Sequence, residues 1–175
     1  LGSGGVGGYF GARLVEAGAN ITFFVRKKRA EFINTFGISI KSPHGDCLVK
    51  ANTLSIGNKK QSFDLVILTC KAYDLESSLN DLNLVLSNKP VFLPLLNGMS
   101  HIKFLRNRFG KNKVLAGAAH IASVLTSKNV IKQLNPIQIL TIGSIESDLV
   151  NTAIKFKNIC ENAKFKTIYA ENILQ

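Results

Sequence analysis

Three glycines near the start of the chain, Gly2-x-Gly4-x-x-Gly7, have the spacing of a phosphate-binding turn. In such a turn the first glycine permits a tight bend, the second lets the backbone approach a pyrophosphate, and the third lets the next helix pack closely. That helix would direct unpaired N–H groups and a partial positive charge at the phosphates. Because the chain holds 14 glycines, the spacing alone is weak evidence, and the surrounding elements decide its meaning.

A basic residue occupies the position that normally distinguishes two dinucleotide cofactors. Residues 20–25 are β-branched and aromatic, as in a strand buried on both faces, and Arg26 follows directly. An acidic side chain here would accept a hydrogen bond from the adenosine ribose of NAD, whereas a guanidinium can clamp the extra phosphate of NADP. Lys27, Lys28 and Arg29 add positive charge. The sequence therefore favours NADP, with a solvated basic turn as the alternative.

Two further polar residues, Lys71 and Asn97, each follow a buried apolar segment. Ligands of open α/β sheets bind at the carboxyl ends of the strands, so residues at these positions are candidates for contact. A lysine can donate to ribose or phosphate oxygens, and an asparagine can donate and accept toward cofactor or substrate. The alternatives are that Lys71 simply leaves its strand for solvent and that Asn97 forms a left-handed turn before Gly98.

The hydrophobic pattern predicts a regular alternation of helices and strands. Helical stripes cover residues 6–15, 30–36, 75–86, 102–109 and 149–159; strands are expected over 20–25, 64–70, 91–96 and 166–169; and 38–41 with 47–50 suggest an antiparallel hairpin. Asp148 is expected to cap the last helix. Short pieces at 114–118, 130–134 and 138–142, the last two separated by Asn135-Pro136, suggest an antiparallel edge.

These elements predict one α/β domain over residues 1–169, a Rossmann-like doubly wound, mainly parallel sheet covered by helices. Only Leu1 precedes the glycine turn, so we expect the first strand to be truncated. Residues 170–175 resemble the start of a helix that would link to a further domain.

The balance of charges predicts a positive surface that attracts anions, without identifying any one of them. Lys and Arg total 22 against 11 Asp and Glu, a net charge of +11. Nucleic acid, an acidic membrane and a phosphorylated cofactor would all fit, as would scattered solubilising lysines. The sequence lacks a basic stripe interleaved with aromatic residues, which would favour nucleic acid as the ligand. No apolar run reaches the roughly 20 residues of a membrane helix. Three separated cysteines and no recognisable leader favour a soluble, cytoplasmic protein.

The histidines His44, His101 and His120 show no spacing with Cys, Asp or Glu that would build a metal site or a catalytic triad. We therefore expect no metal. His120 follows a predicted strand and could approach a nicotinamide, but a satisfied structural histidine is the favoured interpretation. Asp74 and Glu76 are interpreted as carboxylates at a helix N-terminus.

Together, four segments resemble the ketopantoate reductases (2-dehydropantoate 2-reductases). The resemblance is spread over roughly the first 100 residues, and residues 117–134 are similar to the family's next segment. The matching motifs are Gly-Ser-Gly-Gly-Val-Gly-Gly-Tyr-Phe-Gly from Gly2, Val25-Arg26, Cys70-Lys71-Ala72-Tyr73 and Leu96-Asn97-Gly98-Met99.

The resemblance implies roles for particular residues. Those expected to contact NADPH are Gly2, Ser3, Gly4, Gly5, Val6, Gly7, Arg26, Lys71 and Asn97. It also implies that Asn97 lies beside a small keto acid substrate. In the family the proton-donating lysine and a catalytic glutamate lie in a helical C-terminal domain beyond the matched region, so no catalytic residue is assigned to this chain, and a homodimer through that domain stays open.

The reaction implied is the NADPH-dependent reduction of 2-dehydropantoate to pantoate, a step of pantothenate and coenzyme A biosynthesis. Two alternatives stay open. One is a reductase or dehydrogenase of the same plan that acts on another keto or hydroxy acid with NADP. The other is a module that senses NADP without catalysis.

Overall fold

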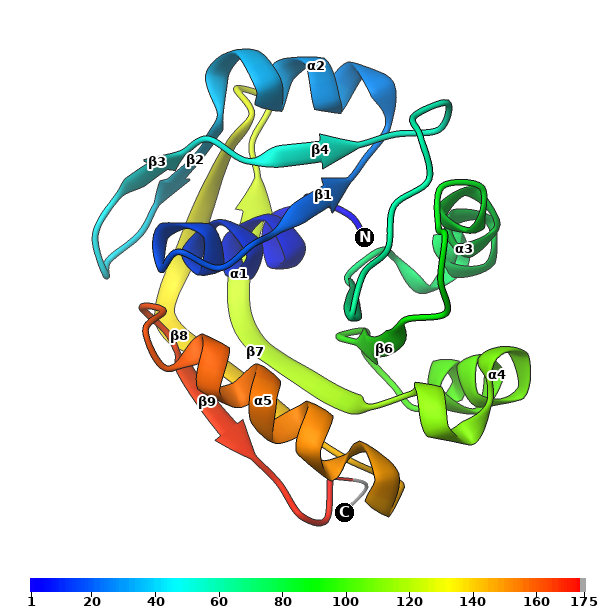
Figure 1. Ribbon diagram of the computed structural model, residues 1–175. Coiled ribbons are helices and arrows are strands. Elements are labelled where there is room, and N and C mark those ends of the chain that lie inside the picture. The colour runs from blue at the N-terminus through cyan, green and yellow to red at the C-terminus, as the bar shows by residue number, and fades with distance from the viewer. Residues whose placement is uncertain (174–175) are drawn as a thin grey trace.

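Helix α1 (Gly5–Glu16) lies at the centre of the fold, with strands on both sides of it (Figure 1). The computed structural model describes residues 1–173. Every residue from Gly8 to Leu14 is buried. A helix enclosed in this way cannot have a solvated face, and its small and apolar residues meet this requirement. α1 therefore packs between two layers of strands. Its N-terminus directly follows the glycine turn.

Two parallel strand pairs lie on one side of α1. They are β1 (Thr22–Phe24) with β4 (Asn52–Leu54), and β5 (Leu65–Leu68) with β6 (Val91–Pro94). Helices α3 (Leu75–Asn83) and α4 (Ser100–Phe109) pack against β5 and β6 through a second apolar cluster that includes Leu79, Leu105 and Val66. With α1 on one face and α3 and α4 on the other, the doubly wound arrangement is confirmed.

The first two residues of the chain join these pairs. The amide of Gly2 donates to the carbonyl of Phe24 at 3.2 Å, and the amino group of Leu1 donates to the carbonyl of Ile67 at 2.6 Å. Leu1 and Gly2 thus hold the position of a strand between β1 and β5. Beyond them an apolar cavity of about 110 Å³ separates the two strands.

The opposite layer is a mixed sheet with the order β3-β2-β8-β7 and β9 paired to β8. Its strands are β2 (Ile38–Lys41), β3 (Cys47–Val49), β7 (Ala116–Leu125), β8 (Val130–Gly143) and β9 (Lys166–Tyr169). The pairs β2–β3 and β7–β8 are antiparallel, as the hairpin pattern predicts, whereas β2–β8 and β8–β9 are parallel. Helix α2 (Lys27–Phe36) follows β1, and α5 (Val150–Cys160) precedes β9.

The expectation of short strands in the last third of the chain is wrong. Strands β7 and β8 are long and form one curved hairpin, and β8 continues through Asn135-Pro136. The register explains how. Gln138 pairs with Ile121 and Gln133 with Ser123, so the residues between the two glutamines bulge out of the ladder. A proline is tolerated there because the bulge demands no ladder hydrogen bond from it.

Smaller differences concern helix ends. Helix α2 begins at Lys27, three residues before the predicted start, with Arg26 as its N-cap. Asp148 does not cap α5, because it lies in the short 3₁₀ helix η3 (Ser147–Leu149) and Leu149 is the N-cap. Residues 171–173 form a turn, and the remainder of the predicted linking helix, residues 174–175, lies outside the described residues.

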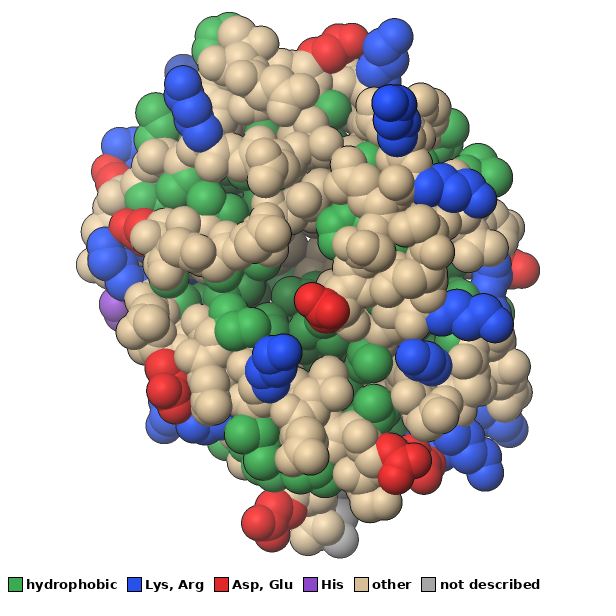
Figure 2. Space-filling model, viewed as in Figure 1, with side chains coloured by type: hydrophobic (Ala, Val, Ile, Leu, Met, Phe, Trp, Pro, Cys, Tyr) green, Lys and Arg blue, Asp and Glu red, His purple; other side chains and the backbone are tan. Residues whose placement is uncertain are grey.

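The surface shows no single basic patch on the face seen in Figure 2. Lys and Arg side chains are scattered there and mixed with Asp and Glu, and hydrophobic side chains gather where the surface is hollowed. None of the helices described between residues 1 and 173 has the length and apolar character needed to cross a membrane.

Candidate functional site

A cavity of about 1000 Å³ opens where strands β1, β5 and β6 end and α1 begins. Four segments that are far apart in the sequence meet in it: the glycine turn, the start of α2, the segment after β5 and the segment after β6. Of the nine residues expected at a cofactor, eight line this cavity: Gly2, Ser3, Gly4, Gly5, Val6, Arg26, Lys71 and Asn97. The fold thus assembles almost the whole set that the sequence singles out.

The glycine turn has the geometry of an anion site. Gly2 has φ +93°, a conformation that other residues rarely adopt. Gly4 is the N-cap of α1, and the first turn holds neither a capping side chain nor an acidic residue. The N–H groups at the start of α1, in the cavity wall, therefore have no side-chain partner and can bind a phosphate.

Gly7 is the one expected residue outside the cavity lining, and it has a packing role. A Cβ atom there would lie 2.1 Å from Oγ1 of Thr69 and 2.5 Å from the carbonyl oxygen of Gly2. Only glycine permits this approach of α1 to the end of β5. The third glycine therefore acts as the spacing predicts, by fixing where the helix starts.

Arg26 lies at the cavity rim as the N-cap of α2, with an exposed side chain. Lys27 and Arg29 also line the cavity, whereas Lys28 does not. These basic residues belong to the first turn of a helix and not to a loose turn, which fixes the backbone from which they extend.

Lys71 and Asn97 are both exposed at the ends of their strands and line the cavity. Lys71 precedes the 3₁₀ helix η1 (Ala72–Asp74). Asn97 does not adopt the left-handed backbone conformation that was its alternative interpretation. The positive φ of +85° belongs to Gly98, whereas the φ of Asn97 is not positive. The Asn97 amide is thus available to a ligand.

The charges around the cavity are unevenly distributed. Arg26, Lys27 and Arg29 lie together on α2, while the carboxylates of Asp74 and Asp81 belong to η1 and α3. A ligand with phosphates at the glycine turn and an uncharged, hydrogen-bonding portion elsewhere matches this distribution.

Comparison with known proteins identifies the family. The family model described as ketopantoate reductase PanE/ApbA matches residues 1–147. The chain belongs to the ketopantoate reductase family. The uncharacterized oxidoreductase YkpB of Bacillus subtilis (strain 168) is 40% identical over 131 residues, which are 75% of this chain and 43% of that protein. The 2-dehydropantoate 2-reductase of Nostoc sp. (strain PCC 7120) is 26% identical over 155 residues, 88% of this chain and 48% of that protein. The chain thus spans about half the length of these relatives.

Solved structures share the fold of this ketopantoate reductase family member. D-mandelate dehydrogenase, solved with NADH and anilino(oxo)acetate, superposes with a TM-score of 0.86 at 19% identity, covering 99% of this chain and 56% of that one. The 2-dehydropantoate 2-reductase of Geobacter metallireducens GS-15 has a TM-score of 0.84 at 21% identity, covering 97% and 56%. These neighbours confirm the Rossmann-like α/β architecture.

A further wall of the cavity is formed by β7, which the sequence analysis did not assign to the site. Ala119, Ile121 and Ser123 line it. A Cβ atom on Gly5 would lie 2.3 Å from the Ser123 carbonyl oxygen, so β7 lies directly against the start of α1. No motif surrounds these residues, and only the pairing of β7 in the mixed sheet brings them here.

His120 does not line the cavity, so the less favoured possibility that it approaches a nicotinamide is not supported. Its neighbours Ala119 and Ile121 line the cavity, and because side chains alternate along a strand, His120 points to the other face and is exposed. Within residues 1–173, no three His, Cys, Asp or Glu side chains are grouped so as to hold a metal ion. Cys70 also lines the cavity. Burial raises the pKa of its thiol, so the neutral form is favoured.

Proposed function

We propose that this chain is the cofactor-binding domain of an NADPH-dependent reductase that converts 2-dehydropantoate to pantoate, a step of pantothenate and coenzyme A biosynthesis. The observation that carries the proposal is the cavity at the strand ends, where the glycine turn, Arg26, Lys71 and Asn97 meet. Membership of the ketopantoate reductase family supports the choice of a small keto acid as substrate.

The residues fit a phosphorylated dinucleotide. The N–H groups at the start of α1 would bind the pyrophosphate, and the guanidinium of Arg26 would clamp the extra ribose phosphate. Lys71 would donate to ribose or phosphate oxygens from the opposite side of the cavity. A bound nicotinamide cofactor supplies the hydride for reducing a ketone.

Asn97 is the residue of this chain closest in role to the reaction. Its amide follows β6 and can donate one hydrogen bond and accept another, which would orient a nicotinamide and a keto acid relative to each other. The family resemblance assigns the proton donor to a helical region outside the matched segment. This chain therefore binds and orients, and the proton comes from elsewhere.

The test is NADPH consumption by the full-length protein with 2-dehydropantoate, in parallel with pyruvate and other 2-keto acids, and repeated with NADH. We expect turnover with NADPH and 2-dehydropantoate and little with the other pairs. No turnover with any keto acid, despite cofactor binding, would contradict the proposal and favour a non-catalytic NADP sensor.

A second candidate, a reductase or dehydrogenase acting on another keto or hydroxy acid, is favoured by one comparison. The chain shares its fold with a D-mandelate dehydrogenase solved with NADH. If this candidate holds, the same assay will show turnover with an aromatic keto acid such as benzoylformate, and NADH will compete with NADPH.

Replacing Asn97 tests the site within the active protein. Asn97→Ala should lower kcat roughly tenfold or more, because a hydrogen bond made to the reacting groups is lost. Its melting temperature should stay unchanged, since the side chain is exposed. Asn107→Ala, an equally exposed change on α4 away from the cavity, is the control. Wild-type kinetics for Asn97→Ala would remove this residue from the site.

A further inference from the structure

Arg29 connects the glycine turn, which lines the cavity, to the distant turn between β7 and β8. Its Nε donates to Oγ of Ser3 in the glycine turn at 3.1 Å, and its Nη1 donates to Oδ1 of Asn129 at 2.9 Å. Asn129 lies in the turn between β7 and β8, and its φ of +60° gives the backbone a left-handed bend there. The guanidinium is thus held beside the glycine turn, and both of its hydrogen-bond partners are neutral.

No carboxylate of residues 1–173 neutralises the charge of Arg29, and the face of the Phe32 ring, 5.4 Å from its guanidinium carbon, compensates it only weakly. The ion pairs found among residues 1–173 all involve other side chains, so no carboxylate lies within ion-pair distance of Arg29. Its Nη2 is buried and has no hydrogen-bond partner in this part of the chain. Burial lowers the pKa of the guanidinium, as expected for a cation partly removed from water.

The position of Arg29 on α2 makes its charge more unfavourable. Arg26, Lys27, Lys28 and Arg29 crowd the N-terminal end of this helix, and its first turn contains no acidic residue. Cations repel the positive end of a helix dipole and one another. An unpaired, partly buried cation in this setting destabilises the fold until an anion approaches it.

We propose that Arg29 binds the pyrophosphate of the dinucleotide, in a role separate from the ribose-phosphate clamp of Arg26. This inference rests on the proposed function. Ser3 belongs to the same turn that presents the N–H groups of α1, so its bond to Arg29 places the guanidinium next to where a pyrophosphate would lie. Because NADPH and NADH share the pyrophosphate, Arg29 contributes equally to the affinity for both cofactors.

The central experiment is a fluorescence titration of the full-length protein and its Arg29→Gln variant with NADPH and with NADH. The amide nitrogen of glutamine lies at about the position of the arginine Nε, so it can still donate to Ser3 but carries no charge. We expect both cofactors to bind roughly tenfold or more weakly, by about the same factor. The melting temperature without cofactor should stay the same or rise, since an uncompensated charge is removed. A residue with only a structural role would instead lower it.

Two further variants refine the assignment. Asn129→Gly keeps the left-handed bend without strain and removes one partner of Arg29, so it should weaken both cofactors by a smaller factor than Arg29→Gln. Arg108→Ala is the matched control, because Arg108 lies on α4, outside the cavity lining, and bonds to Asn80. It should leave both affinities unchanged.

Inorganic pyrophosphate separates this inference from the proposed function. It should raise the melting temperature of the wild type and not that of Arg29→Gln. If the wild type binds neither dinucleotide but responds to pyrophosphate through Arg29, the proposed function fails and the anion site stands. The inference is overturned if Arg29→Gln weakens NADPH alone, if it changes neither affinity, or if pyrophosphate stabilises both proteins alike.

Discussion

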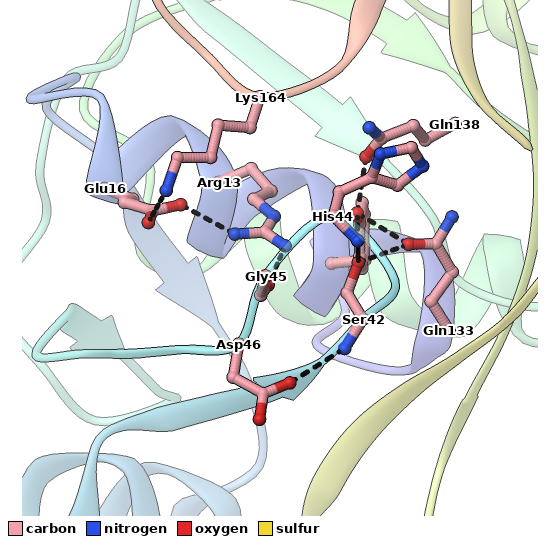
Figure 3. A network of polar contacts seen from close by, with 10 residues as sticks. Arg13, Glu16, Ser42, His44, Gly45, Asp46, Gln133, Gln138 and Lys164 are labelled. Carbon is pink, nitrogen blue, oxygen red and sulfur yellow. Dashed lines mark hydrogen bonds and ion pairs between the residues drawn. The ribbon is translucent and has the colours of Figure 1, made fainter. Parts of the chain in front are cut away.

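The two ends of helix α1 lie beside arginines that the protein treats in opposite ways. Near its C-terminal end Arg13 is fully buried, yet its Nη1 donates to Glu16 at 2.8 Å and its Nη2 to the carbonyl of Gly45 at 2.6 Å. Lys164 adds a second cation to Glu16 at 2.7 Å (Figure 3). At the N-terminal end the hydrogen bonds of Arg29 within the described residues 1–173 go to neutral groups, Ser3 and Asn129.

The difference separates structural charge from charge available to a ligand. A buried cation paired with a carboxylate has its desolvation offset within the fold, so it gains little from an added anion. The desolvation of a partly buried cation without a carboxylate partner is not offset in this way, so a bound anion stabilises it much more. We call the C-terminal end of α1 at Arg13 the closed end and the N-terminal end beside Arg29 the open end. The paired charge at the closed end therefore stabilises the fold, and the charge at the open end is suited to binding an anion.

Tyr9 extends the closed end. Its hydroxyl hydrogen-bonds with Ser42, Gln133 and Gln138, and so ties α1 to the β2–β3 turn and to both sides of the β8 bulge. His44 of the same turn bonds to the carbonyl of Pro136 inside the bulge at 2.7 Å. The bulge that carries the proline is thus held in place by polar side chains.

The largest effect on this comparison should come from Arg13→Met, which keeps an unbranched apolar stem and removes the guanidinium with its charge. The two charge-assisted hydrogen bonds to Glu16 and to the carbonyl of Gly45 are lost, at a cost of about 3 kcal/mol, so the urea midpoint should fall clearly. NADPH affinity of the folded protein should not change. If affinity falls while stability holds, the two ends of α1 are not separate in function.

Arg26→Ala should have the opposite signature. Losing a charge-assisted bond to the ribose phosphate costs about 1.5–3 kcal/mol of NADPH affinity, roughly 10- to 100-fold, with little change for NADH. Stability should hold because the side chain is exposed. Titration of both cofactors checks this, and equal losses for the two would exclude Arg26 as the phosphate clamp.

Tyr9→Phe should be milder than Arg13→Met. It removes a hydroxyl that serves the buried amide of Gln133, at a cost of about 1–2 kcal/mol in the free energy of unfolding. Tyr73→Phe removes a hydroxyl from an exposed ring and serves as the control for stability. A Tyr9→Phe protein as stable as the wild type would show that the network only fills space.

The smallest effect is a pH dependence at the closed end. Burial alone would raise the pKa of Glu16, but hydrogen bonds from Lys164 and Arg13 outweigh it and hold the pKa below its ordinary value of 4.5. A carboxylate with a lowered pKa in the fold stabilises it above the unfolded value, and this stabilisation is lost as the pH falls through the folded pKa. The stability gap between wild type and Glu16→Gln should therefore be present at pH 7 and shrink below about pH 4.5. Equal gaps at both pH values would argue against the ion pair.

Local features of the sequence determined much of the site. Glycine spacing fixes a turn and a helix start within a few residues, and an apolar run of strand length shows where a strand must end. The polar residue that follows each run, such as Lys71 or Asn97, then lies at the carboxyl edge of a sheet. These inferences succeed because they depend on neighbours in the chain.

Only the tertiary structure decided which charges are neutralised. Arg13 and Arg29 both lie within helices, and their immediate sequence does not show their distant partners. Arg13 is buried against the carbonyl of Gly45, whereas Arg29 meets Asn129, 100 positions away. The same holds for Ser123 and His120, whose directions follow from the register of β7. Partners at such separations are set by how strands pair and helices pack, which is a property of the whole fold and not of any segment.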